Sequence, residues 1–269
     1  MDNRIIFLDT ETTGLCPDYE RIVEIAAIEV NQNYQPKKIF HEYLDPLKSV
    51  GSSYRIHGLS DQFLHGRRTF EDIADDFVQF INGATVYAHN LSFDQRFINS
   101  ELQRCGLDNL EDYANPIDTL PLARRIVHGR ASLDALIDLF DIDGSARDEY
   151  HGALIDAELL LKVFLCLNGK KEAARLINCD ALNDKDAHYQ DSLSKERKMI
   201  DETDYDPDEI SFDESDDYRY KLEAIIEFSD DNSWFDGSMY EDMLYQLDEK
   251  DFLTDRQKEV IDKIYAQFC

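Results

Sequence analysis

Arg4-Ile5-Ile6-Phe7-Leu8-Asp9-Thr10-Glu11-Thr12-Thr13-Gly14 is the stretch on which our prediction of the fold depends. Its apolar run from Ile5 to Leu8 is typical of a strand buried on both faces of an α/β sheet. Asp9 and Glu11 follow at alternate positions, so their side chains point to the same face. Burying two like charges there is costly unless a cation lies between them, and carboxylate oxygens suit Mg²⁺ or Mn²⁺. The stretch therefore predicts a metal site at a strand end, from which Gly14 lets the chain turn sharply. The alternative is a strand end with two solvated acids.

Composition limits the class of protein. The chain has 269 residues, of which 43% are hydrophobic, so it can bury a substantial core. No stretch approaches the ~20 apolar residues that span a bilayer, and we expect no membrane association. Five widely spaced cysteines without a C-x-x-C pair indicate reduced thiols and a cytoplasmic location.

Acidic residues dominate, and they are unevenly distributed. The net charge is −29, and residues 1–175 carry 29 acidic and 18 basic side chains. The shorter segment 176–269 carries the other 28 acidic and 10 basic side chains. Proteins that bind duplex nucleic acid tightly present a basic face, so this chain alone is not expected to do so. The charge does not exclude an enzyme that holds a few nucleotides through metal ions.

The next segments predict an antiparallel meander followed by helices. Residues 21–31 and 37–44 are expected strands, in which Glu24 and Glu29 are interpreted as strand-end or exposed residues. Ser60 is a predicted helix cap, and Thr69 caps an amphipathic helix with an apolar stripe up to residue 81. A helix from Ser132 is expected to bury Leu136, Leu139 and Phe140.

Two further acidic residues follow short predicted strands. Residues 85–90 form the first of these strands, and Asp94 lies in the first turn of the helix after it. An acid there is favoured by the helix dipole in any protein, but open α/β sheets also place their sites after central strands. Asp118 lies at the end of the second strand, residues 116–119, where Asp118 or Thr119 is expected to cap the next helix, and Asp118 is interpreted as that cap and not as a metal ligand.

A late helix provides the remaining candidates. His151 precedes or begins this helix, which is predicted to extend from about residue 150 to Leu167, and Asp156 lies one turn into it. Because five residues are less than one and a half turns, the two side chains would approach one site from different distances. A lone histidine at a helix start is otherwise a capping or surface residue.

The C-terminal third differs in character from the rest. We expect residues 1–180 to form the main domain, 181–217 an acidic and flexible linker, and 218–269 a small helical module. Capping boxes at Ser238 and Thr254 precede two helices that would form a hairpin with one apolar seam, which Trp234 and Phe235 could close. Such a unit is small, so we expect it to dock on the main domain, on itself or on a partner.

Five segments, in this order, carry a family resemblance: Phe7-Leu8-Asp9-Thr10-Glu11-Thr12-Thr13-Gly14, Ile56-His57-Gly58-Leu59-Ser60-Asp61, Ala88-His89-Asn90-x-x-Phe93-Asp94, Ser132-Leu133-Asp134-Ala135-Leu136 and His151-Gly152-Ala153-Leu154-Ile155-Asp156-Ala157. Together they resemble the DEDDh 3′→5′ exonucleases, and most of all the epsilon-type proofreading subunits of bacterial DNA polymerase III. The resemblance covers roughly residues 4–170.

The resemblance implies a ribonuclease-H-like fold, with a mixed five-stranded sheet flanked by helices. It implies two Mg²⁺ or Mn²⁺ ions held by four carboxylates and a general base, His151, that takes a proton from the attacking water. The implied metal ligands are Asp9, Glu11, Asp94 and Asp156. The residues implied to border the terminal nucleotide are Thr12, Gly14 and His57, of which His57 could equally be structural.

The leading hypothesis is a 3′→5′ exonuclease that acts on single-stranded or frayed DNA 3′ ends and releases nucleoside 5′-monophosphates. In that case a polymerase could bind the C-terminal module, and the enzyme could proofread. An exoribonuclease that trims RNA is the alternative enzyme, because the same site chemistry serves both. A polymerase-docking or DNA-mimicking protein is the alternative from another class, and the intact set of acids weighs against it.

Overall fold

The computed structural model of the chain describes residues 4–127, 131–145 and 151–179, together with separate positions between 218 and 261. The chain forms two compact units, Met1–Lys198 and Met199–Cys269, which are described separately below. The predicted linker at 181–217 lies outside the described residues, and the domain boundary at residue 180 stays a prediction.

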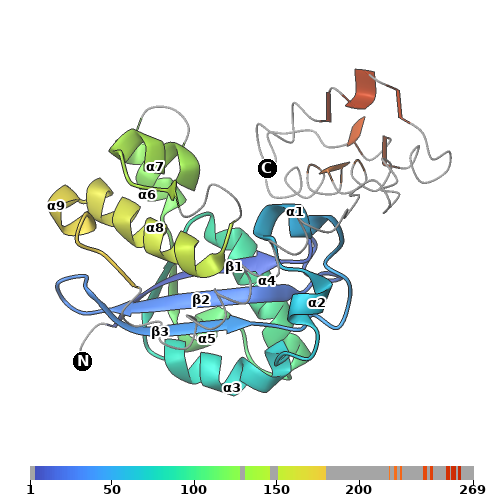
Figure 1. Cartoon of the computed structure of the whole chain (residues 1–269), viewed down its shortest axis with the longest axis horizontal. Coiled ribbons are helices and arrows are strands. Elements are labelled where there is room, and N and C mark those ends of the chain that lie inside the picture. Colours follow the sequence, from blue (N-terminus) through green and yellow to red (C-terminus); the bar gives the residue numbers. More distant parts are fainter. Residues whose placement is uncertain are drawn as a thin grey trace. The chain divides into compact units, whose positions relative to one another are not determined.

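Five strands form one mixed sheet in the order β3-β2-β1-β4-β5 (Figure 1). Their bounds are β1 Ile5–Thr12, β2 Ile22–Val30, β3 Pro36–Tyr43, β4 Thr85–Ala88 and β5 Asn115–Asp118. The first three strands pair antiparallel, whereas β1 pairs with β4, and β4 with β5, in parallel. The predicted α/β class, the meander and the mixed five-stranded sheet are confirmed.

Helices connect and cover these strands. They are the 3-10 helix η1 Gly51–Ser53, α1 Tyr54–His57, α2 Asp61–Leu64, α3 Phe70–Ile81, α4 Leu91–Arg104, α5 Leu110–Tyr113, α6 Leu120–Ile126, α7 Leu133–Phe140, α8 Ala153–Leu167 and α9 Lys171–Ala174. The caps follow the sequence. The Ser60 hydroxyl accepts a hydrogen bond from the Phe63 amide at 3.0 Å, and Thr69 forms a capping box with Asp72.

Strand β1 is buried on both faces, as its apolar run predicts. Ile6 and Leu8 pack in one cluster with Phe77 of α3. Phe7 points to the opposite face, where its ring lies 5.2 Å from that of Phe164 in α8. Figure 1 shows α8 and α3 on opposite sides of the sheet. Asp9 and Glu11 continue the alternation of Phe7, so their side chains emerge on the α8 face.

Glu24 and Glu29 are not exposed, so that part of their interpretation is wrong, although Glu29 is the penultimate residue of β2. Both lie within β2 and each is 2% exposed. Glu29 accepts hydrogen bonds from Arg4 at 2.7 Å and from Lys37 at 3.0 Å, whereas Glu24 lies 2.7 Å from Nε2 of His41. Burial of Glu29 is tolerated because Arg4 and Lys37 compensate its charge, and the buried carboxylate of Glu24 is hydrogen-bonded to the His41 ring.

Two helices depart from the sequence prediction. Helix α8 begins at Ala153, because Gly152 is extended, with φ −155° and ψ 131°. In α7, Leu139 is 57% exposed although we expected it in the apolar stripe. Leu136 is buried as predicted, and Ile137 is buried in place of Leu139, which centres the buried face between Leu136 and Ile137 and leaves Leu139 about 110° away around the helix.

The second unit contains a small apolar cluster of its own. A predicted capping box is confirmed there, since the Gln257 side chain accepts from the Thr254 amide at 2.9 Å and the Thr254 hydroxyl accepts from the Gln257 amide at 3.3 Å. Ser238, Trp234 and Phe235, which entered other predictions, lie outside the described residues. The buried members of the cluster are Tyr218, Leu222, Ile225, Tyr240, Met243, Leu253 and Ile261.

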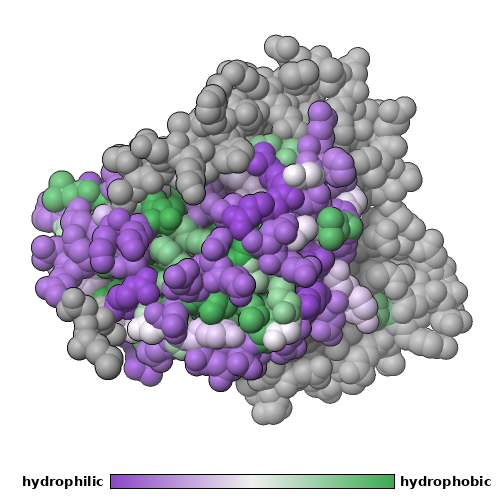
Figure 2. All heavy atoms as spheres, turned by 90° about the horizontal axis from the view of Figure 1, so that it is seen from below, coloured by the Kyte–Doolittle hydropathy of each residue, from purple (hydrophilic) through white to green (hydrophobic). Residues whose placement is uncertain are grey.

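The face of the molecule in Figure 2 is mainly hydrophilic where its residues are described. Figure 2 shows one face of the molecule, on which apolar side chains occur only in small groups. Within the described part of the chain, no helix is long and apolar enough to cross a bilayer. Four cysteines in this part carry free thiols: Cys16, Cys105, Cys166 and Cys179.

Candidate active site

The C-terminal end of β1 supplies the first two carboxylates. Asp9 is half-buried and Glu11 is 8% exposed, and both emerge on the face that α8 covers. In the register with β2, Asp9 lies opposite Ala26 and Glu11 lies opposite Glu24. The alternation predicted from the sequence therefore places these two acids side by side on one face of the central strand.

Helix α8 and the residue before its N-cap supply the next two groups. Asp156 lies in the first turn of α8 and is 4% exposed. His151 precedes Gly152, and its side chain is 41% exposed. The His151 Nδ1 atom lies 3.7 Å from Oδ2 of Asp156. One ligand atom each of Glu11, His151 and Asp156 lie within 4.8 Å of one another, which is a spacing that fits a common metal ion.

Asp94 reaches β1 from the other side of the sheet. It lies in the first turn of α4, is 4% exposed and accepts a hydrogen bond from the Thr10 hydroxyl at 2.8 Å. Burial raises the pKa of its carboxyl from 3.8 to about 7, against the lowering effect of the hydrogen bond from Thr10, and nearby Asp118 raises it further. Thr10 lies between Asp9 and Glu11 but faces the opposite side of β1, so Asp94 is attached to the same strand from that side. Among the described residues, the group within 4.8 Å contains Glu11, His151 and Asp156, and includes neither Asp94 nor Asp9.

The connection around β4 and β5 fixes the start of α4. Asn90 is the N-cap residue and adopts a left-handed conformation, with φ 61°. The Asp118 carboxylate accepts hydrogen bonds from the Asn90 amide at 3.0 Å and from the Leu120 amide at 2.8 Å. The N-cap residue of α6 is Thr119, whose side chain makes no capping bond, so the Asp118 side chain, from the end of β5, accepts from the first amides at both helix starts instead.

The residues implied to border the nucleotide have different surroundings. The Thr12 hydroxyl donates to the Gly14 carbonyl at 2.6 Å, at the open end of β1. Residues 13–15 form a bend after β1, so the chain turns at Gly14 as expected, although Gly14 does not adopt the left-handed conformation that glycine permits. The Glu20 side chain approaches it instead, and a Cβ atom at this position would lie 2.8 Å from Glu20 Cγ. His57 is the last residue of α1 and is 1% exposed.

Three residues beside the site were not identified from the sequence, namely Thr10, Glu24 and His41. Thr10 could have been found, because it is a hydroxyl residue between two acids. Glu24 and His41 form a buried pair on the α8 face, and Glu24 oxygens lie 3.8–4.0 Å from a Cβ built on Gly152. That pair had no local signal, because it joins two strands 17 residues apart.

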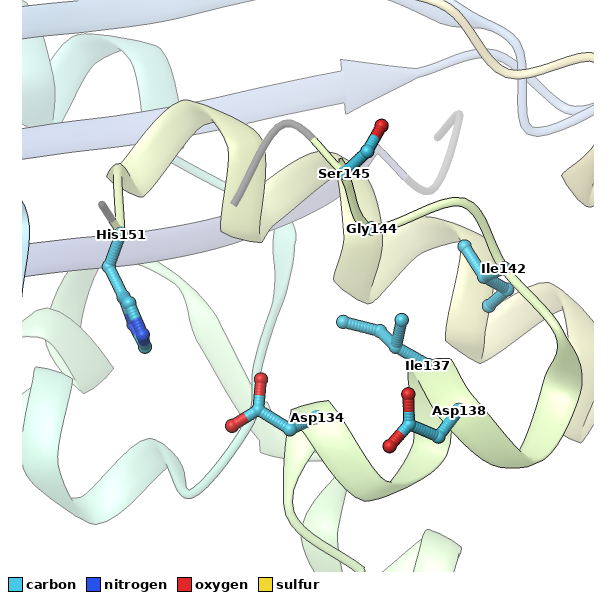
Figure 3. Close-up of a pocket in the computed structure, with 7 residues that line it drawn as sticks. All are labelled: Asp134, Ile137, Asp138, Ile142, Gly144, Ser145 and His151. Carbon is cyan, nitrogen blue, oxygen red and sulfur yellow. The ribbon is translucent and has the colours of Figure 1, made fainter. Parts of the chain in front are cut away.

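A cavity of about 290 Å³ lies beside His151. Figure 3 shows the His151 ring and the Asp134 carboxylate pointing into the same space, below the start of α8. His151 thus belongs both to this cavity and to the carboxylate cluster. Its ring has open space on one side, which accounts for its exposure. The cavity is lined by Asp134, Ile137, Asp138, Ile142, Gly144, Ser145 and His151.

Comparisons with known proteins agree with this geometry. The family model described as Exonuclease matches residues 6–164. The DNA polymerase III subunit epsilon of Rickettsia prowazekii is 44% identical over 182 residues, which cover 65% of this chain and 79% of that protein. The subunit of the same name from Buchnera aphidicola (subsp. Schizaphis graminum) is 38% identical over 208 residues, which cover 73% and 88%.

Solved structures show the same fold. A zinc-bound complex of E. coli exonuclease I with single-stranded DNA aligns with a TM-score of 0.56 at 16% identity, over 64% of this chain and 42% of that chain. A complex of the same exonuclease with an oligonucleotide gives a TM-score of 0.53 at 17% identity, over 65% and 42%. The match thus spans less than half of exonuclease I, and at these identities it supports the fold alone.

Proposed function

From the premise that this chain belongs to the exonuclease family, we propose how its site carries out 3′→5′ hydrolysis. The chain is a 3′→5′ exonuclease, related to epsilon subunits of DNA polymerase III. The observation that carries the proposed mechanism is the convergence of Glu11, His151 and Asp156 within 4.8 Å at the end of the central strand. The bond hydrolysed is a phosphodiester at a DNA 3′ end, and the product is a nucleoside 5′-monophosphate.

The donor set fits a divalent cation. The family depends on divalent metal ions, and the buried oxygens of Glu11, Asp94 and Asp156 are hard ligands of the kind that Mg²⁺ and Mn²⁺ prefer. Two such ions would be held by these three residues and Asp9. When bound, they supply positive charge that stabilises the phosphoryl oxygens and the leaving oxygen. The raised pKa of Asp94 indicates the cost of an ionised carboxylate there without a cation.

His151 acts as the general base in this proposal. Its ring is partly exposed and lies 3.7 Å from Asp156, so it can accept a proton from water at the edge of the acidic cluster. A neutral imidazole nitrogen can accept a proton near neutral pH. The backbone at Thr12 and Gly14 borders the same strand end, where the terminal nucleotide would lie.

The names of the relatives support the substrate and the partner that we propose. The curated relatives bear the name of a DNA polymerase III subunit, so we assign DNA, single-stranded or frayed, as the substrate. We also assign a proofreading role beside a polymerase in the cytoplasm, with the C-terminal module as the contact. RNA trimming remains the alternative, because discrimination depends on contacts to the 2′-hydroxyl.

Digestion of 5′-labelled single-stranded DNA and RNA of the same sequence tests the proposal. We expect a ladder shortened from the 3′ end, release of nucleoside 5′-monophosphates, loss of activity in EDTA and faster digestion of DNA. Asp156→Asn should lower kcat by at least about 10³-fold, whereas Glu172→Gln, a change at an exposed residue of α9, should not. Faster digestion of RNA would overturn the substrate, and full activity of Asp156→Asn would overturn the site.

A further inference from the structure

The main chain of the proposed general base is held by a hydrogen bond from a distant segment. The amide of His151 donates to the carbonyl of Ile56 in α1, at 2.9 Å. Figure 1 shows α1 beside the N-terminal end of α8. Because the His151 ring is 41% exposed, contacts of its main chain contribute strongly to fixing its position. The position of Ile56 therefore bears directly on where the base lies.

His57, the next residue after Ile56, is buried at the centre of a small hydrogen-bond network. Its Nδ1 atom accepts from the Leu59 amide at 3.0 Å, and its Nε2 atom lies 2.9 Å from the Ser53 hydroxyl. The Ser53 hydroxyl donates its hydrogen bond to the Val50 carbonyl at 2.7 Å. The His57 ring must then donate from Nε2 to Ser53, which fixes a neutral ring with its proton on Nε2.

This network closes the short helix α1 at both of its ends. Ser53 precedes α1, and Leu59 follows Gly58, which has a left-handed φ of 66°. The Gly58 amide also donates to Tyr54 at 2.7 Å. Leu59 is buried in an apolar cluster with Val23 of β2, so the segment is attached to the sheet. The His57 ring thus connects Ser53, before α1, with Leu59, after it. Since Leu59 packs against β2, these bonds hold the turn that carries the Ile56 carbonyl.

We infer that His57 is a positioning residue that acts on the reaction through Ile56 and His151, and does not contact the nucleotide. The inference rests on the proposed role of His151 as the base. The His57 ring is 1% exposed, and its two nitrogens bond to Ser53 and Leu59, so it offers no surface to a substrate. A shift of about 1 Å in a catalytic group can cost about 10²-fold in rate. Loosening the turn would therefore be felt in kcat.

A double-mutant cycle tests this inference in the full-length protein. We would measure kcat and KM on a short single-stranded oligonucleotide for His57→Ala, His151→Ala and the double variant. His57→Ala should lower kcat by about 10- to 100-fold with KM nearly unchanged. In the His151→Ala background the same change should have almost no further effect, because the group that it positions is gone.

Two more variants keep the test decisive. His57→Asn retains an acceptor for the Leu59 amide, so it should lose less activity than His57→Ala, and it replaces His57→Ala in the cycle if the latter does not fold. His65→Ala is the matched control, since that side chain is 89% exposed after α2, and its kcat should equal that of the wild type. Melting temperatures show which variants fold.

The outcomes separate this inference from the proposed function. A raised KM with unchanged kcat in His57→Ala would show a nucleotide contact and overturn the positioning role. Equal losses from His57→Ala with and without His151 would indicate a general structural effect and overturn it as well. Full activity in His151→Ala would overturn the base assignment and, with it, the role of His57. Loss in both single variants without further loss in the double variant supports both.

Discussion

Helix α4 buries a carboxylate near each end, and the two have opposite surroundings. Glu101, in its last turns, is fully buried and pairs with Arg21 through two contacts, at 2.7 and 2.9 Å. It also accepts from the Ile22 amide at 3.2 Å. Asp94, in the first turn, is 4% exposed and bonds to the Thr10 hydroxyl, and within the described residues no Arg or Lys forms an ion pair with it.

The difference indicates two uses of a buried acid. The charge of Glu101 is neutralised within the protein, so this residue attaches α4 to the start of β2 and needs nothing from outside. Asp94 carries a pKa raised to about 7 by burial, which means that its ionised form is costly until a cation arrives. Helix α4 is thus fixed at one end by a completed ion pair and presents an uncompensated ligand at the other.

The largest expected effect is the fall in kcat on removing the charge of Asp94, the acid without a cationic partner among the described residues. Asp94→Asn keeps the shape of the side chain and an acceptor for Thr10, but it removes the negative charge. We expect kcat for digestion of single-stranded DNA to fall by at least about 10³-fold while the fold is retained. Steady-state kinetics together with circular dichroism would check this. A fall below tenfold would remove Asp94 from the set of ligands.

Breaking the completed pair should act on stability instead. Glu101→Gln leaves the Arg21 guanidinium partly buried without its countercharge, so we expect the free energy of unfolding to fall by about 3–5 kcal/mol. Urea denaturation would measure this fall. Glu111→Gln, an exposed change on α5, is the control. At a temperature where Glu101→Gln is folded, the kcat of this variant should stay within a few-fold of that of the wild type. A loss as large as that of Asp94→Asn would erase the distinction between the two ends.

The sequence predicts the position of an acid when that position depends on its own strand or helix. It does not predict burial that depends on a side chain far away in the sequence. Asp9 and Glu11 were predicted because the two-residue period of one strand defines their face, and Asp156 because it lies one turn into a helix. Burial of Glu101 depends on Arg21, which is 80 residues away, and no local pattern encodes that pair.

The exposed interpretation of Glu24 failed for the same reason, since its partner His41 lies on the next strand. The Ile56 contact to His151 could not be predicted at all, because a carbonyl is present in every residue and carries no signal in the side chain. Patterns within one element thus predict faces, and contacts between elements decide which acids are compensated.

The stability of the metal-free protein should depend on pH through Asp94. Below about pH 4 the carboxyl is protonated in both folded and unfolded chains, so the cost is absent. Between pH 4 and 7 the unfolded chain ionises first, because the folded pKa is about 7 and the ordinary value is 3.8. The free energy of unfolding therefore falls with rising pH over that interval. In EDTA, Asp94→Asn should gain stability relative to the wild type from pH 5 to 7.

Melting temperatures at pH 5, 6, 7 and 8 would follow that gain. Asp75→Asn, at an exposed position of α3, should show a constant difference from the wild type over the same series. A difference for Asp94→Asn that does not grow with pH would mean that Asp94 is compensated in the metal-free protein, and the contrast with Glu101 would disappear.

The smallest expected effect is stabilisation by the metal ion itself. At ten times its dissociation constant, Mg²⁺ should stabilise the folded protein by about 1.4 kcal/mol, or a few degrees in melting temperature. Glu101→Gln should show the same increment from a lower starting temperature, because its defect lies away from the ligands. Asp94→Asn should start higher at pH 8 and gain less from Mg²⁺, since one ligand is missing. Equal increments in all three proteins would place the ion elsewhere, whereas a selective loss in Asp94→Asn would show that the cation compensates the acid that the fold leaves uncompensated.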